Sequence, residues 1–182
     1  MNKNGIVVVG IDPQIMQDKK LWEIIQTTQT VFNKALVLLK DAGDERTGGY
    51  ATIIREDLWP LIVRVPFGVI PLEKAPKWSE LSTEKCLRLM ENKDHFASYE
   101  SRNPEAEITT LQGIIEKWGK WGGGIKAWKH LLGFSGLPEL WDEAVELVVA
   151  IKCNLLSKTI ALHNISQERN PHFRTLLAVV ES

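Results

Sequence analysis

A turn of two glycines around a serine is the clearest place for chemistry in this sequence. It reads Gly-Phe-Ser-Gly at residues 133–136 and leads into a helix start that carries Asp142 and Glu143. Glycine adopts positive φ without penalty, and Ser135 can cap the amide groups at the start of that helix. Helix starts bind anions. Ser135 is therefore a candidate ligand-binding residue, although the nearby acids complement the helix macrodipole and oppose a phosphate. A capped helix that closes a hairpin, with no ligand, is the alternative interpretation.

Arg102 is the second candidate, together with Asn103 beside it. Arg102 follows a predicted strand and precedes Asn103-Pro104. Its guanidinium could hold a carboxylate through two parallel hydrogen bonds, as the binding of a small acid or a haem propionate requires. The alternative is a surface salt bridge to Glu100 or Glu105.

Catalysis has less support than binding. The order Gly-Phe-Ser-Gly lacks the spacing of a serine hydrolase elbow. The four histidines share no ligand spacing, so each is expected to be an ordinary side chain; they are His95, His130, His163 and His172. Residues 7–13 resemble the first strand of ribonuclease H-like nucleases, in which an aspartate binds a divalent metal. Gln14 stands where that family has glycine, and an extended arm is favoured instead. We expect a protein without enzymatic activity.

Composition restricts the class of protein. The 182 residues, 44% of them hydrophobic, suit one domain over residues 1–182, with a core at about 20–156 and a C-terminal extension over 157–182. A net charge of −1 gives no basic field for nucleic acid. The chain lacks a stretch of about 18 apolar residues and a signal-peptide pattern, so we expect a cytoplasmic protein with no membrane partner. Cys86 and Cys153 are then expected to be free, buried thiols.

The elements that must position the candidate residues begin with a long helix. Apolar residues recur at helical spacing over residues 20–40, and the pattern ends before Gly43. Residues 50–55 and 61–65 are rich in Ile and Val and are joined by a link that contains Pro60, which predicts a central hairpin.

The middle of the chain predicts two more helices and one strand. Ser82 is the expected N-cap of a helix that buries Cys86. Residues 96–100 could pair as a strand. Asn103-Pro104 then predicts a helix start, and apolar residues at helical spacing extend the predicted helix over residues 108–118.

A glycine run introduces the second predicted hairpin. Four glycines fall within residues 119–124, among them the candidate ligand-binding residues Gly123 and Gly124. Strands follow at residues 125–128 and 131–134, with Lys129-His130 at the bend. Two further helices are expected, one over residues 140–156 and one that begins at Asn170-Pro171. The order of elements predicts an α+β fold, an antiparallel sheet flanked by helices.

Several motifs in this order resemble the GlcG/HbpS-like family. The resemblance covers residues 20–156 in element order and is closest in letters near 122–146. The motifs are Lys40-Asp41-Ala42-Gly43, Ser98-Tyr99-Glu100-Ser101-Arg102-Asn103-Pro104, Gly122-Gly123-Gly124-Ile125, Gly133-Phe134-Ser135-Gly136 and Asp142-Glu143-Ala144.

The resemblance implies a profilin-like fold, a sheet of about five strands flanked by helices, and a tendency to form homo-oligomers. It makes haem a possible cofactor, since known members include a haem-binding accessory protein, alongside a protein encoded with glycolate-oxidation genes. The segment at 108–118 departs from the family as an insertion, and the two ends of the chain have no family counterpart.

Three functions remain open from the sequence. The first is a non-enzymatic binding protein whose pocket lies beside residues 122–135 and takes a small organic acid or a tetrapyrrole. The second is a structural or oligomeric module, because seven tryptophans are many for this length and suit a core or a subunit interface. The third is a metal-dependent nuclease or a hydrolase.

Overall fold

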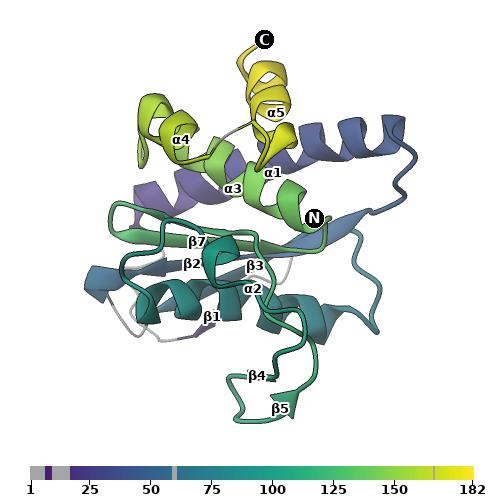
Figure 1. The fold of residues 1–182 in the computed structure, drawn as a ribbon, viewed down its shortest axis with the longest axis vertical. Coiled ribbons are helices and arrows are strands. Elements are labelled where there is room, and N and C mark those ends of the chain that lie inside the picture. Colours follow the sequence, from purple (N-terminus) through teal and green to yellow (C-terminus); the bar gives the residue numbers. More distant parts are fainter. Residues whose placement is uncertain (1–6, 10–16, 59–60, 166) are drawn as a thin grey trace.

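The protein is built in layers, with helices on both faces of an antiparallel sheet (Figure 1). The computed structural model describes residues 7–9, 17–58, 61–165 and 167–182. Helices α1 (Lys19–Asp41) and α3 (Glu139–Lys152) pack on one face, and α2 (Ala75–Glu91) packs on the other. The expected antiparallel sheet between helices is therefore confirmed at this level.

Four strands in the order β3-β2-β7-β6 make up the sheet, and β1 (Val7–Val9) pairs with the outer side of β3. Both predicted hairpins are confirmed. The first joins β2 (Gly48–Arg55) to β3 (Ile62–Gly68), and the second joins β6 (Gly124–Ala127) to β7 (His130–Ser135). The hairpins meet where β2 pairs with β7, so that Tyr50 lies opposite Ser135.

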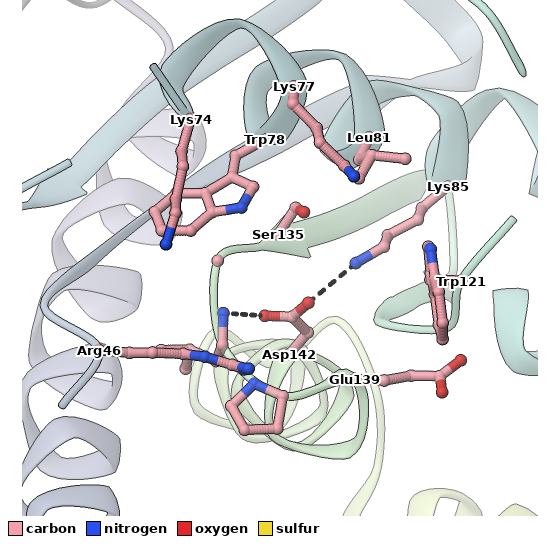
Figure 2. A pocket seen from close by; sticks show the side chains of 13 residues that line it. Arg46, Lys74, Lys77, Trp78, Leu81, Lys85, Trp121, Ser135, Glu139 and Asp142 are labelled. Carbon is pink, nitrogen blue, oxygen red and sulfur yellow. Dashed lines mark hydrogen bonds and ion pairs between the residues drawn. The ribbon is translucent and has the colours of Figure 1, made fainter. Parts of the chain in front are cut away.

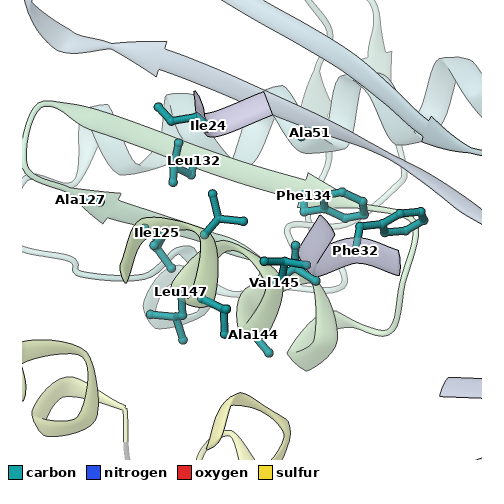
Figure 3. Close-up of a cluster of buried hydrophobic side chains, with 14 of the residues drawn as sticks. Ile24, Phe32, Ala51, Ile125, Ala127, Leu132, Phe134, Ala144, Val145 and Leu147 are labelled. Atoms are coloured by element: carbon teal, nitrogen blue, oxygen red, sulfur yellow. The ribbon is translucent and has the colours of Figure 1, made fainter. Parts of the chain in front are cut away.

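The main core lies between the sheet and the helices α1 and α3. Strand residues alternate in direction, and those that face these helices are apolar, as Figure 3 shows. Phe32 of α1 packs against Phe134 of β7 with ring centroids 5.4 Å apart. Asp18 caps α1 by accepting hydrogen bonds from the amides of Lys20 and Leu21. The predicted long helix is confirmed.

The second face of the sheet carries a smaller apolar cluster under α2. Ser82 is not the N-cap that the sequence predicted, because α2 begins at Ala75 with Pro76 in its first turn. Proline is tolerated in the first turn of a helix, because an N–H group at that position would have no hydrogen-bond partner within the helix. The Ser82 hydroxyl lies inside the helix, donates to the carbonyl of Ser79 and lies 2.7 Å from Oγ1 of Thr52 on the sheet.

The predicted helix over residues 108–118 is wrong. Its place is taken by a small hairpin of β4 (Ile108–Thr109) and β5 (Ile115–Glu116). Gly113 has a φ of +79°, which ends any helix there. The Thr110 hydroxyl accepts a hydrogen bond from the amide of Ile114 and closes the turn. Local hydrogen bonding by threonine therefore competes with the helical pattern.

The predicted strand over residues 96–100 is also wrong. The Glu100 carboxylate accepts hydrogen bonds from the amides of Phe96 and Ala97, both at 2.8 Å, and curls the chain into the short 3₁₀ turn Ser98–Ser101. Ala97 alone pairs with the sheet, opposite Ile125 of β6.

The C-terminal segment forms α4 (Lys158–Asn164) and α5 (Pro171–Glu181). Asn170 caps α5 as predicted, since its side-chain oxygen accepts from the amides of His172 and Phe173. Helix α5 packs on α3, and its Phe173 belongs to the main core. Among the described helices, none has the length and apolarity needed to cross a bilayer.

Candidate functional site

A cavity of about 400 Å³ opens where the turn after β7 leads into α3 (Figure 2). We call it the α2–α3 cavity, because most of its lining comes from these two helices and the turn before α3. Its wall combines four cations, two acids and two indole rings with small and apolar groups. The lining residues are Arg46, Lys74, Lys77, Trp78, Leu81, Lys85, Trp121, Ser135, Gly136, Leu137, Pro138, Glu139 and Asp142.

Helix α2 supplies four of these residues, and its N-cap Lys74 supplies a fifth. Each of Lys74, Lys77, Trp78, Leu81 and Lys85 has another member of the set three or four residues away, which places them on one side of a helix. Figure 2 shows them on the α2 turns above the cavity. We call this stripe the lysine face of α2. A stripe that would ordinarily be apolar thus carries three amines.

Lys85 and Asp142 form a buried ion pair on the cavity floor. The Lys85 ammonium donates to Oδ2 of Asp142 at 2.9 Å and to the carbonyl of Phe134. The other carboxylate oxygen of Asp142 accepts from the amide of Leu137 at 2.9 Å. Burial raises the pKa of Asp142 to about 6, although Lys85 acts to lower it. The sequence alone explained Asp142 by its position at a helix start. In the structure it is the partner of Lys85, which comes from the helix on the opposite face of the sheet.

Gly123 has no side chain, and the space that it leaves is occupied by the ion pair of Lys85 and Asp142. A Cβ on Gly123 would lie 2.5 Å from Cβ of Asp142 and 2.8 Å from Nζ of Lys85. Its φ of +103° is also one that other residues rarely adopt. Gly124 is close to the same lysine, 3.0 Å from its Cβ, and its amide donates to the Ser98 hydroxyl. The predicted ligand-binding residues Gly123 and Gly124 therefore lie behind the cavity floor, packed against Lys85.

A second buried carboxyl group, Glu146, lies one helical turn beyond Asp142. Burial and the negative charge of Asp142 raise the pKa of Glu146 to about 8, against the effect of Lys85. Its Oε1 atom has no hydrogen-bond partner. Two acids thus share one lysine, and near neutral pH the cluster holds a proton that free carboxylates would release.

Three cations at the cavity are paired weakly or not at all with the carboxylates that the structure describes. Within the described part of the chain, Lys74 and Lys77 form no salt bridge; their amines lie over the rings of Trp78 and Trp118, at 5.6 and 5.9 Å from the centroids. The Nε atom of Arg46 is 3.8 Å from Oδ1 of Asp44, a long contact. These cations are available to an anion that enters the cavity.

Arg102 lies beside the cavity and is already occupied. Its Nε donates to both carboxylate oxygens of Glu139 at 2.9 Å, and its guanidinium lies over the rings of Tyr99 and Trp121. The expected alternative partners, Glu100 and Glu105, are therefore replaced by a residue of α3. Arg102 neutralises the Glu139 carboxylate, which also accepts a hydrogen bond from the amide of Gly122 at 2.5 Å.

The other predicted site residues lie at different distances from the cavity. Ser135 lines it. Ser135 does not cap α3, whose N-cap is Pro138 and has no side-chain hydrogen bond. The expected capping is wrong because Asp142 takes the free amide of Leu137 instead. Asn103 pairs with Lys120 through two backbone hydrogen bonds of 2.8 Å and is not part of the lining.

The histidines and cysteines lie away from the α2–α3 cavity. His130 does not tip the hairpin as expected but begins β7, buried at 4% exposure, and the turn is made by Trp128 with a φ of +54°. His172 stacks on Trp141 at 4.4 Å. Cys86 and Cys153 are free and buried, as predicted. No group of three metal-binding side chains occurs among the described residues, and Asp12 and Gln14 of the predicted nuclease strand lie outside them.

The lysine face is the functional feature that sequence reasoning missed. The signal was present as Lys74, Lys77 and Lys85 at helical spacing with Trp78. A helix predicted to start at Ser82 excludes Lys74, Lys77 and Trp78, so the stripe could not be recognised. Comparison with known family models, curated proteins and solved structures finds no match to this chain.

Proposed function

We propose that this protein binds a small organic acid in the α2–α3 cavity without transforming it. The observation that carries the proposal is a cavity of about 400 Å³ lined by Lys74 and Lys77, which form no salt bridge within the described residues, and by Arg46, whose Nε is paired with Asp44 only at 3.8 Å. Cavities of this size hold small ligands. The indole rings of Trp78 and Trp121 offer flat apolar walls to the body of the acid.

Binding is favoured over catalysis because the ionisable groups on the floor neutralise each other. Lys85 is engaged by Asp142, and Glu139 is engaged by Arg102. Ser135 shares the lining with no histidine that could activate it. An organic acid is favoured over haem, because the lining offers no His, Cys, Met or Tyr as an axial ligand.

The order of elements supports a profilin-like fold of the GlcG/HbpS-like type as part of the same proposal. A helix, a hairpin, a helix, a second hairpin and a helix follow one another, and the hairpins pair through β2 and β7. The pairing of Ala97 with Ile125 extends the sheet beyond β6.

Isothermal titration of the full chain with benzoate, succinate and inorganic phosphate tests the proposal. We expect at least one organic acid to bind and to raise the melting temperature, since a ligand at about 100 times its Kd adds about 2.7 kcal/mol to stability. Lys74→Gln and Lys77→Gln should weaken binding, whereas Lys34→Gln on the exposed side of α1 should not. Absence of binding by every acid would contradict the proposal. A Soret band on haemin titration, lost in Lys77→Gln, would favour the tetrapyrrole instead.

Self-association is a second candidate function, supported by the β4–β5 hairpin. Leu111, Ile114 and Ile115 are exposed there, Ile115 at 64%. Exposed apolar groups of this kind suit an interface between copies of the chain. Light scattering should then detect an oligomer that Ile114→Lys dissociates, and a monomer at all concentrations would contradict it.

A further inference from the structure

We infer that the acid bound in the α2–α3 cavity is a dicarboxylate, with its two acidic groups separated by an apolar body that lies against Trp78. This inference rests on the proposed function and adds the class of ligand. The dicarboxylate is inferred from the positions of Arg46, Lys74 and Lys77 along the cavity.

The outer end of the ligand site is defined by a second cavity. A space of about 300 Å³ shares Arg46, Lys74 and Trp78 with the α2–α3 cavity, so the two form one continuous depression, and the acids Asp44 and Glu45 line only the far space. Lys77 and Lys85 do not line this second space. The guanidinium of Arg46 and the amine of Lys74 therefore mark the junction between the two cavities. Figure 2 shows the Lys74 amine pointing from α2 toward Arg46.

The inner end of the site has a different cation. Lys77 lies further along the lysine face, next to Leu81 and Lys85 (Figure 2). Lys85 is buried and its charge is already paired with Asp142, and it also donates to the carbonyl of Phe134, so Lys77 is the amine whose charge remains for a ligand at this end. The amines of Lys74 and Lys77 thus belong to positions about one turn apart along the helix, with Trp78 and Leu81 in the same stripe.

An acid with a single charge would satisfy only one of these groups. A second carboxylate would pair with the other, and hydrogen bonds between charged groups are the strong ones. The acids near the inner end limit the charge that can enter. Glu139 and Asp142 line the cavity and each takes up the charge of a cation, so Lys77 alone remains at this end and can neutralise one negative charge but not the two of a phosphate. A ligand with one carboxylate at each end would pair with the cations at both ends and would bring only one negative charge to the inner end.

Titration calorimetry with matched pairs of acids tests this inference on the full chain. Each dicarboxylate is compared with the monoacid of the same body: terephthalate with benzoate, adipate with hexanoate and succinate with butyrate. We expect at least one dicarboxylate to bind at least about tenfold tighter than its monoacid, the ratio that one added charge-assisted contact gives. Inorganic phosphate should bind more weakly than this dicarboxylate.

Variants at each end then separate the two contacts. Lys74→Gln and Lys77→Gln, which change side chains that are not fully buried, should each reduce the ratio of the best pair to within about twofold. Lys34→Gln should leave the ratio unchanged. Circular dichroism and the unfolding midpoint of each variant confirm that it is folded.

The outcomes distinguish this inference from the proposed function. Monoacids that bind as tightly as dicarboxylates in every pair would overturn the dicarboxylate and leave acid binding in place. A dicarboxylate advantage that survives both lysine variants would likewise overturn the assignment of the two ends. Failure of all six acids to bind would reject the proposed function itself, and the dicarboxylate with it.

Discussion

Lys85 Nζ lies 2.9 Å from Oδ2 of Asp142, although the two residues belong to helices on opposite faces of the sheet. The lysine side chain passes the start of β6, where Gly123 and Gly124 leave space for it. This contact ties α2 to α3 at the floor of the α2–α3 cavity. The position of the lysine face relative to the turn before α3 therefore depends on a buried ion pair.

Lys85→Met should destabilise the fold more at high pH than at low pH. Without the ammonium, Asp142 and Glu146 lose the buried cation that lowers their pKa values, and their ionised forms become more costly in the folded state. Removal of one partner from a buried pair costs about 3–5 kcal/mol. We expect a loss of this size near pH 8 and a clearly smaller loss near pH 5, where both carboxyls hold protons. Urea unfolding at the two pH values measures the difference.

Lys34→Met provides the control for that experiment, because Lys34 is exposed on α1. It should change the unfolding free energy by less than about 0.5 kcal/mol at either pH. An equal loss for Lys85→Met at both pH values would show that the carboxyls do not respond to the lysine.

Glu146→Gln should become progressively more stable than the parent chain as pH rises. The pKa of Glu146 is about 8 in the folded protein, whereas the ordinary value is 4.5. The folded state therefore holds a proton that the unfolded state releases, and the stability contributed by this group falls between the two values. Glutamine has no proton to lose. The difference between the two chains should grow by up to about 1.4 kcal/mol per pH unit in that window.

Urea unfolding of both chains from about pH 5 to about pH 8 measures this difference. Other titrating groups, including His130 and His172, whose pKa values are lowered by burial, are common to both chains and cancel. A difference that stays constant across the range would contradict the raised pKa of Glu146.

Gly123→Ala should cost more stability than Gly43→Ala. Both glycines have positive φ, +103° and +83°, so alanine at either position is destabilised by its backbone conformation by about 1–2 kcal/mol. Only at Gly123 does the new Cβ meet the ion pair, whereas nothing lies within 4 Å of a Cβ at Gly43. We expect an additional loss of at least about 2 kcal/mol for Gly123→Ala. Equal losses would mean that the pair shifts aside without cost.

The elements that the sequence predicted correctly are those in which local pattern and tertiary packing agree. Helix α1 buries the apolar stripe that the sequence shows, and the strands of the two hairpins are mostly buried, as their apolar residues indicate. Asn170 caps α5 through a hydrogen bond to amides two and three residues away, which is local information. The helix predicted over residues 108–118 is wrong because Gly113 and the Thr110 hydroxyl favour a turn within the helical spacing.

The candidate site could be predicted only in part. Ser135 and Gly136 line the cavity, and Gly123 lies behind its floor, but the role of that glycine depends on Lys85, which is 57 residues from Asp142 in sequence. Nothing local to Asp142 distinguishes a buried ion pair from a surface acid at a helix start. Arg102 was recognised as a carboxylate partner, yet the carboxylate that it holds belongs to α3 of the same chain.

Arg102→Gln should weaken the binding of organic acids without removing any group that contacts them. Arg102 neutralises Glu139, whose carboxylate lines the α2–α3 cavity. Loss of the guanidinium leaves an uncompensated negative charge there, and a like charge nearby repels the ligand carboxylate. We expect a loss in affinity of about three- to tenfold, which corresponds to about 0.7–1.4 kcal/mol. Glu139→Gln should have the opposite effect and tighten binding.

The double variant Arg102→Gln/Glu139→Gln decides whether charge is the cause. If Arg102 acts only by neutralising Glu139, the double variant should bind acids at least as tightly as the parent chain, because neither charge remains. If Arg102 itself contacts the ligand, its loss should weaken binding equally with or without Glu139. Calorimetric titration of all four chains with the same dicarboxylate distinguishes the two. Increasing salt should shrink the effect of Arg102→Gln, since screening weakens interactions between charges that are not in contact.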